Sequence, residues 1–242
     1  MKDLGRLITA MVTPFKDNGD VDYERAKEFS KALVDTGSDG LLIGGTTGES
    51  PSMNEDEKLQ LFKSVKEAVG DTASVIAGTT DNNTIASVDL SKKAEKLGVD
   101  AILLTVPAYN KPTQEGLYKH FKLISESVNI PGILYNVPSR TSLNMDAETT
   151  LRLSKIENIV GVKEASSDPD QITNIIAKAN DDFKVWSGND NETFSIMSTG
   201  GYGVVSVASN IIGNQVKKLM GYVLDGQTEL AAKEHKLSLI HI

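Results

Sequence analysis

The feature that most constrains the fold is an alternation of two hydrophobic patterns along the whole chain. Short runs of β-branched and other apolar residues have the length and composition of buried strands. The longer segments between them carry apolar side chains at intervals of three and four residues, the spacing of amphipathic helices. Strand, helix, strand at an even spacing predicts right-handed βαβ units and therefore a parallel sheet.

Eight such units fit into the 242 residues. The expected strands are Leu7–Thr13, Gly40–Ile43, Ser74–Ala77, Ala101–Thr105, Gly132–Tyr135, Ile159–Lys163, Lys184–Ser187 and Gly203–Val207. Helices are expected, for example, at Asp22–Thr36, Asn54–Val69, Thr84–Leu97, Thr113–Ser127, Pro169–Ala179 and Asn214–Leu224. Eight parallel units in a chain of about 250 residues predict an α/β fold closed into a (β/α)8, or TIM, barrel.

A doubly wound open sheet is the alternative fold. Its dinucleotide-binding form carries Gly-x-Gly-x-x-Gly after the first strand, whereas Thr13-Pro14-Phe15 stands at that place here. The second predicted helix begins with Asn54 and has Glu57 three residues later, which indicates a capping box. We therefore prefer one barrel domain, with no linker and no internal repeat beyond the βα alternation.

Composition excludes several classes of function. There is no cysteine, so disulfides and thiolate metal sites are ruled out, and the three histidines have no metal-ligand spacing. The net charge of −8 argues against a nucleic-acid partner. The chain begins without a signal-peptide pattern and has no apolar run of the roughly 20 residues that a membrane helix needs. We expect a cytoplasmic protein with no metal, nucleic-acid or membrane partner.

The sixth predicted strand carries the most informative residue. In such barrels the chemistry lies at the carboxyl ends of the strands. Alternation predicts that Val160 and Val162 face the helices, whereas Gly161 and Lys163 face the barrel axis. Desolvation lowers the pKa of a lysine held there, and a neutral amine can attack a ketone to form an imine. The alternative is a lysine that reaches solvent or pairs with Glu164.

The fifth predicted strand and the loop after it offer two further groups. Tyr135 is expected at the same level as Lys163 on the neighbouring strand, where it could transfer protons or simply pack in the core. Arg140 lies in the following loop, where a guanidinium could bind a carboxylate with two hydrogen bonds or could be an ordinary surface residue. Neither residue is decisive without the other.

Two glycine-rich segments have different expected roles. Gly44–Ser50 follows the second strand, and its glycines, hydroxyls and amides suit a small carboxylate or form a flexible turn. A phosphate-binding P-loop would need a lysine where Glu49 stands, so nucleotide binding is disfavoured. Thr199–Gly203 precedes the eighth strand and is expected at the opposite rim as a structural turn.

Five segments, taken in order and spacing, resemble the dihydrodipicolinate synthase family of the N-acetylneuraminate lyase and class I aldolase superfamily. They are Gly45–Ser50, Tyr109–Pro112, Gln114–Tyr118, Tyr135–Thr141 and Gly161–Ala165. The resemblance extends from Leu7 to about Leu237. It implies a Schiff-base-forming lyase that condenses pyruvate with L-aspartate 4-semialdehyde, the first committed step of diaminopimelate and lysine biosynthesis. It implies no metal and no organic cofactor.

The resemblance also implies a role for each matching residue. Lys163 would form the Schiff base, and Tyr135 would transfer protons through Thr46 and Tyr109. The tyrosine that matches Tyr109 comes from the neighbouring subunit in this family, which implies a homo-oligomer.

The substrate-binding residues follow from the same correspondence. Thr47, Gly188 and the backbone at Val205 would hold pyruvate, and Arg140 would bind the carboxylate of the semialdehyde. The related sugar-acid aldolases, such as N-acetylneuraminate lyase, share the pyruvate half of the site and are the alternative activity. A non-catalytic homologue would lack a catalytic group, and none of these groups is missing.

Three positions depart from the family pattern at the site where lysine binds. Ala108 stands where the family commonly has the first of two tyrosines, and the positions of an acidic residue and a histidine that bind the inhibitor lysine match Ala86 and Lys58. Weak or absent inhibition by lysine is therefore expected.

The carboxyl-terminal end also departs from the family, whose members normally continue for several helices. We expect the barrel at residues 1–226 and the truncated start of a C-terminal helical domain at residues 227–242, with Thr228–Leu237 helical and the residues from Ser238 onward non-native. Full-length members of the family are tetramers. For this chain we expect a dimer or a poorly defined larger species.

Overall fold

The eight strands close into one parallel barrel in which each strand pairs with its sequence neighbours and β8 pairs with β1. The computed structural model describes residues 3–240, with side chains through Lys236. The strands are β1 Leu7–Ala10, β2 Gly40–Ile43, β3 Ser74–Gly78, β4 Ala101–Thr105, β5 Gly132–Asn136, β6 Ile159–Glu164, β7 Lys184–Ser187 and β8 Gly203–Ser206. The (β/α)8 barrel predicted from the alternation is confirmed.

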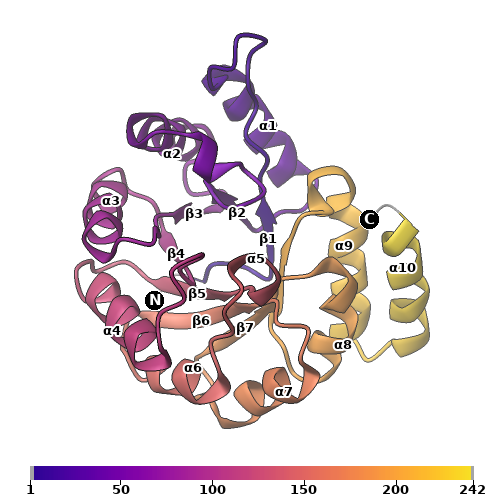
Figure 1. The fold of residues 1–242 in the computed structure, drawn as a ribbon. Helices are drawn as coiled ribbons and strands as arrows, with labels where there is room; N and C mark the ends of the chain where they lie inside the picture. Colours follow the sequence, from indigo (N-terminus) through magenta and orange to yellow (C-terminus); the bar gives the residue numbers. More distant parts are fainter. Residues whose placement is uncertain (1–2, 241–242) are drawn as a thin grey trace.

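Helices surround the barrel, as Figure 1 shows. The α-helices are α1 Tyr23–Asp35, α2 Glu55–Val69, α3 Thr84–Lys96, α4 Gln114–Ser125, α5 Pro138–Thr141, α6 Ala147–Leu153, α7 Pro169–Lys178, α8 Thr193–Ser198, α9 Ser209–Leu224 and α10 Thr228–Ile240, with 3-10 turns η1 Ser50–Ser52 and η2 Asp190–Glu192. The predicted capping box is present, because the Asn54 amide donates to Glu57 and the Glu57 amide donates to the Asn54 side chain.

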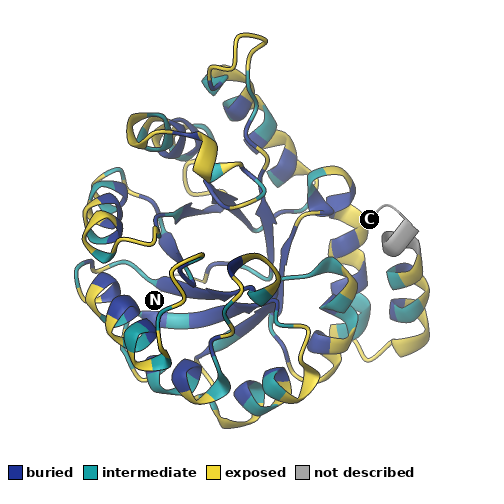
Figure 2. Cartoon of the chain, viewed as in Figure 1, coloured by how far each residue is buried: buried dark blue, intermediate teal, exposed yellow. Residues whose placement is uncertain are grey.

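The core has an inner and an outer layer. Inside the barrel, apolar side chains from the strands form one cluster that includes Ile8, Leu42, Ile76, Leu103, Ile133 and Trp186. Outside it, the strands pack against the helices in further clusters. Figure 2 shows the consequence, with buried strands and helices that are exposed only on their outer faces. Burial of both faces requires the nearly continuous apolar strands seen in the sequence.

Two boundaries within the barrel differ by three or more residues from the sequence-based predictions. β1 ends at Ala10 rather than Thr13, since the Thr13 hydroxyl donates to the Gly48 carbonyl and Pro14 has no N–H for a ladder. α9 begins at Ser209, five residues earlier than expected, with a break at Ile212 where φ is −129° and ψ is 37°. These departures arise from local hydrogen bonding, which hydrophobic periodicity does not report.

A bulge in β6 changes one predicted side-chain direction. Gly132 pairs with Ile159 and the next residue, Ile133, pairs with Gly161, so Val160 is an extra residue. Val160 consequently packs against the inner cluster, and the prediction that it faces the helices is wrong. Val162 lies in an outer cluster, as expected.

The C-terminal helix α10 packs on the outside of α9 and against α8 and η2 (Figure 1). Because α10 extends to Ile240, the expectation that helical structure ends before Ser238 is wrong. The side chains of Leu239 and Ile240, on which the suspicion of a non-native tail depends, lie outside the described residues. The boundary at residue 226 remains our proposal, and it coincides with Gly226 at φ 71°, between α9 and α10.

Candidate active site

Lys163 lies inside the barrel near the carboxyl end of β6, and its side chain is only 4% exposed. Burial, with a smaller contribution from the Arg140 guanidinium, lowers the pKa of Lys163 to about 7, although the Asp190 carboxylate acts in the opposite direction. A large fraction of this amine is therefore neutral at neutral pH. The predicted inward direction is confirmed, and the two alternatives, a solvated lysine or a pair with Glu164, do not occur.

Tyr135 is the register partner of Lys163 on β5. The Lys163 ammonium nitrogen lies 4.0 Å from the centre of the Tyr135 ring. Burial raises the pKa of Tyr135 to about 12, so the phenol keeps its proton at neutral pH. A nucleophilic amine and a protonated phenol in contact can add to a carbonyl and supply the proton that its oxygen needs.

Trp186 fills the space below Lys163 that the absence of a side chain at Gly161 creates. A Cβ built on Gly161 would lie 2.6 Å from the Trp186 ring and 2.2 Å from the Lys184 carbonyl oxygen. The indole N–H donates to the Gly5 carbonyl at 3.0 Å, which fixes the ring in the barrel. The buried apolar ring of Trp186 therefore occupies the barrel interior below Lys163.

Two charged groups approach Lys163 from neighbouring loops. Arg140 lies exposed in α5, directly beyond β5, and its charge acts on both Lys163 and Tyr135. Asp190, in η2 beyond β7, accepts hydrogen bonds from the Ser206 hydroxyl and from the amides of Val207 and Ala208, at 2.9 and 3.0 Å. Sequence reasoning missed Asp190, although its place just after a predicted strand would have qualified it by the rule that identified Lys163.

The other predicted site residues lie beyond or on strands at the same end of the barrel. Thr46 is exposed and Thr47 half-buried in the loop after β2, and Gly188 follows β7. The Gly188 amide donates to the Glu164 carbonyl at 2.7 Å, and a Cβ there would lie 2.7 Å from that of Ala165. Val205 on β8 belongs to the inner cluster with Tyr135. Thr46, Thr47, Gly188 and Val205 therefore lie around the opening of the barrel at the carboxyl ends of its strands, which we call the mouth of the site.

Tyr109 is not brought to this mouth within one chain. It lies in the loop after β4 with 92% of its surface exposed and a positive φ of 71°, a backbone conformation rare for a tyrosine. Among the described residues, its ring therefore cannot pack on Tyr135. An exposed aromatic ring on a strained loop is typical of a group that contacts another molecule.

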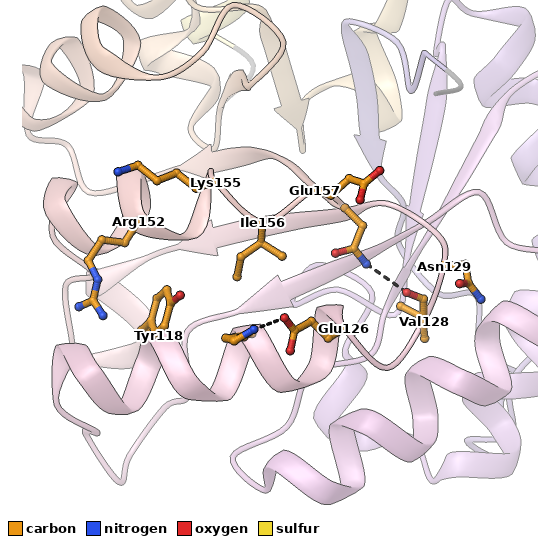
Figure 3. Close-up of a pocket in the computed structure, with 10 residues that line it drawn as sticks. Tyr118, Glu126, Val128, Asn129, Arg152, Lys155, Ile156 and Glu157 are labelled. Carbon is orange, nitrogen blue, oxygen red and sulfur yellow. Dashed lines mark hydrogen bonds and ion pairs between the residues drawn. The ribbon is translucent and has the colours of Figure 1, made fainter.

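A prominent cleft of about 750 Å³ lies at the opposite end of the barrel (Figure 3). It is formed by α4, α6 and the connections that lead into β5 and β6, and it is lined by charges of both signs, including Lys122, Glu126, Arg152 and Lys155. Its position at the amino ends of the strands is where barrels place stabilising rather than catalytic residues. The Thr199–Gly203 turn also precedes β8 at this end, as predicted.

The described part of the chain contains neither a cluster of three or more potential metal ligands from His, Cys, Asp and Glu nor a helix long and apolar enough to cross a membrane. Three features of the structure bear on its chemistry. They are a closed (β/α)8 barrel, a buried lysine of lowered pKa on the sixth strand, and a tyrosine in register with it on the fifth. Together they define the class of barrel lyases that work through a lysine Schiff base.

Comparison with known proteins identifies the family within this class. Residues 3–242 match the model of the dihydrodipicolinate synthetase family. The 4-hydroxy-tetrahydrodipicolinate synthase of Dehalococcoides mccartyi is 56% identical over 98% of this chain and 80% of its own length. The synthase 1 of Halalkalibacterium halodurans is 53% identical over 97% and 79%, respectively. The chain belongs to the dihydrodipicolinate synthetase family.

Solved structures agree with this assignment. The dihydrodipicolinate synthase of Bacillus anthracis superimposes with a TM-score of 0.96 at 47% identity, covering 98% of this chain and 82% of that one. The enzyme of Cyanidioschyzon merolae, solved with lysine bound, gives 0.94 at 43% identity, covering 96% and 80%.

Proposed function

We propose that this chain condenses pyruvate with L-aspartate 4-semialdehyde to give 4-hydroxy-tetrahydrodipicolinate, as a lyase of diaminopimelate and lysine biosynthesis. The observation that carries the proposal is the buried Lys163, of lowered pKa, in contact with Tyr135. The family membership and the names of the relatives support the same reaction. The absence of cysteine suits the reducing cytoplasm, where we place the protein.

The proposed reaction proceeds through a covalent intermediate on Lys163. The neutral Lys163 amine adds to the ketone carbon of pyruvate, and uptake of one proton with loss of one water gives an iminium ion. The iminium draws electrons from the neighbouring methyl group, which loses a proton and becomes an enamine carbon. This carbon bonds to the aldehyde carbon of the second substrate, whose oxygen takes up a proton. The amine of that substrate then attacks the iminium carbon and displaces Lys163, which closes the ring and frees the enzyme.

The remaining roles are assigned by correspondence with the family pattern. Tyr135, together with Thr46 and the Tyr109 of a second subunit, transfers the protons. Thr47, Gly188 and the Val205 backbone hold the pyruvate part. Arg140 at the rim binds the carboxylate of the semialdehyde, which suits a guanidinium that is exposed and adjacent to the reacting centre.

The test is an assay with both substrates. The purified chain should form 4-hydroxy-tetrahydrodipicolinate from pyruvate and the semialdehyde, identified by mass, and should release no pyruvate from N-acetylneuraminate. Pyruvate release from N-acetylneuraminate without condensation would instead assign the chain to the sugar-acid aldolases. The absence of both activities in folded protein would contradict catalysis.

The lowered pKa of Lys163 predicts a distinct pH dependence. Below about pH 7 the ammonium dominates and cannot attack, so the initial rate of imine formation with pyruvate should rise roughly tenfold per pH unit and level off above about pH 7. An unperturbed lysine would give a rate that rises to about pH 10.4. Rapid-quench trapping between pH 5 and 9 measures this dependence, and a rate that still rises at pH 9 would show that the barrel does not depress the pKa.

The exposure of Tyr109 predicts that catalytic activity depends on the association of two copies of the chain. If the ring completes the site of a second copy, Tyr109→Phe should lower kcat of the condensation by about 10- to 100-fold, the contribution of a proton-transfer group. Mixing Tyr109→Phe with an inactive Lys163→Arg chain should then restore part of the activity, because mixed dimers contain one site with both residues. A protein that is monomeric by light scattering at assay concentrations and fully active would contradict this role.

Inhibition by lysine is expected to be weak. Among the residues that match the lysine-binding positions of the family, Lys58 of α2 is a cation and Ala86 of α3 offers no carboxylate. A cation is repelled by the first and not attracted by the second. We expect no inhibition up to roughly 1 mM lysine, a binding free energy weaker than about 4 kcal/mol.

The double substitution Lys58→His with Ala86→Glu is the matched gain-of-function variant and should introduce inhibition. Strong inhibition of the unaltered chain below 1 mM would show that other groups bind the effector.

A further inference from the structure

Behind Lys163 and Tyr135 lies a buried group of polar side chains that the mechanism above does not use. Glu164 follows Lys163 on β6, Asn136 follows Tyr135 on β5, and the two are register partners. Both are fully buried on the outer side of these strands. The Asn136 side-chain amide donates to Glu164 Oε1 at 3.0 Å, and the backbone amide of Ser166 donates to the same oxygen at 2.9 Å.

These contacts extend to the segment that follows Arg140. The Asn136 side chain also donates to Asn144 at 2.8 Å and to the Met145 carbonyl at 3.2 Å, and it accepts from the Met145 amide at 3.0 Å. Gln171 of α7 exchanges hydrogen bonds with Asn144. We refer to Glu164, Asn136, Asn144 and Gln171 as the Glu164 network. It connects β5, β6, α7 and the chain between α5 and α6.

Burial of the Glu164 carboxyl group costs free energy of desolvation, which a residue with a purely structural role would not require. Glu164 Oε2 is buried and has no hydrogen-bond partner among the described residues. Burial is the largest influence on this group and raises the pKa of Glu164 to about 7, while hydrogen bonds from Ser166 and Asn136 oppose it. An apolar side chain of similar volume would avoid that desolvation cost. A polar network in this position instead restricts the strands to one arrangement.

We propose that Glu164 and Asn136 are positioning residues for the lyase reaction. As a hydrogen-bond acceptor, Glu164 fixes the backbones of β5 and β6 at the level where Tyr135 and Lys163 meet. Through Asn136 it also fixes the chain that follows Arg140. Because a displacement of about 1 Å can cost roughly 100-fold in rate, such support acts on chemistry without touching substrate. The inference rests on the proposed function.

Two nearly isosteric substitutions test the acceptor role. Glu164→Gln keeps an acceptor oxygen for Asn136 and Ser166, whereas Glu164→Leu has a similar volume and removes it. We expect Glu164→Gln to stay within about threefold of the unaltered kcat and Glu164→Leu to fall by about 10- to 100-fold. The borohydride-trapped rate of imine formation with pyruvate should fall in parallel, measured per folded protein.

The matched control is Asn158→Ala, at the opposite end of β6. The Asn158 side chain donates to the carbonyls of Ser125 and Val128, in the wall of the cleft of Figure 3. Its loss should lower the melting temperature while kcat is retained. A Glu164→Leu variant with lowered melting temperature and unchanged kcat, or a Glu164→Gln variant as slow as Glu164→Leu, would overturn the proposal.

If the Glu164→Leu variant does not fold, a second variant, Glu164→Asp, tests the proposal. Glu164→Asp keeps the carboxyl group and withdraws it by one methylene, so we expect a folded protein with kcat lowered about tenfold. Unchanged kcat in Glu164→Asp would then count against the positioning role. The proposed function is tested separately by the unaltered chain, which must condense the two substrates before any of these variants is compared with it.

Discussion

Replacing Lys163 by arginine is expected to lower kcat of the condensation by about 10⁴-fold or more, because it removes the nucleophile on which every later step depends. A guanidinium keeps a positive charge in place but stays protonated and does not attack a ketone. The measurement is product formation by mass spectrometry at enzyme concentrations high enough to detect slow turnover. Circular dichroism should show a folded barrel.

The matched control for this variant is Lys184→Arg, a lysine on β7 near the opposite end of the barrel, which should retain activity. Comparable losses in both variants would indicate damage to the fold rather than loss of a nucleophile. Substantial turnover by the Lys163→Arg protein would mean that another residue forms the imine.

Replacing Arg140 by alanine is expected to raise KM for the semialdehyde by about 10- to 100-fold, because a charge-assisted contact with its carboxylate is lost. KM for pyruvate should change much less. The Arg140 charge also lowers the pKa of Lys163, so its removal should move the pH profile upward. Assays at about pH 8.5, where Lys163 is largely neutral in both proteins, separate the two effects.

Arg140→Lys is the informative companion, since it retains the charge and loses the two-pronged geometry. We expect it to keep the pH profile of the unaltered chain and to recover only part of the affinity for the semialdehyde. Equal increases of both KM values in Arg140→Ala would tell against a role in recognising the second substrate.

The fold was predictable because a barrel of parallel strands buries both faces, which leaves an unmistakable alternation in the sequence. The period-two alternation along each strand then predicted that Lys163 points into the barrel and that Tyr135 lies beside it. Both positions are confirmed. The direction of Val160 was predicted wrongly. A bulge inserts one residue without altering the hydrophobic pattern, so period-two reasoning fails at that point.

The short elements that carry Arg140 and Asp190 could not be predicted from hydrophobic periodicity. The short helix α5 around Arg140 and the turn η2 around Asp190 are set by local hydrogen bonds and caps. Glu164 was considered only as an alternative partner for Lys163, although the alternation that directs Lys163 inward directs Glu164 to the opposite face. In the structure the two point to opposite sides of the sheet, and Glu164 accepts a hydrogen bond from Asn136, a residue distant in sequence that periodicity does not connect to it.

Covalent trapping tests the central claim most directly. The protein is incubated with pyruvate, reduced with borohydride, digested and mapped by mass spectrometry. We predict a single pyruvate-derived adduct on the peptide that contains Lys163, formed at neutral pH and absent from Lys163→Arg. An adduct on another lysine, or no adduct on protein shown to be folded, would contradict the proposal that this buried amine is the Schiff-base residue.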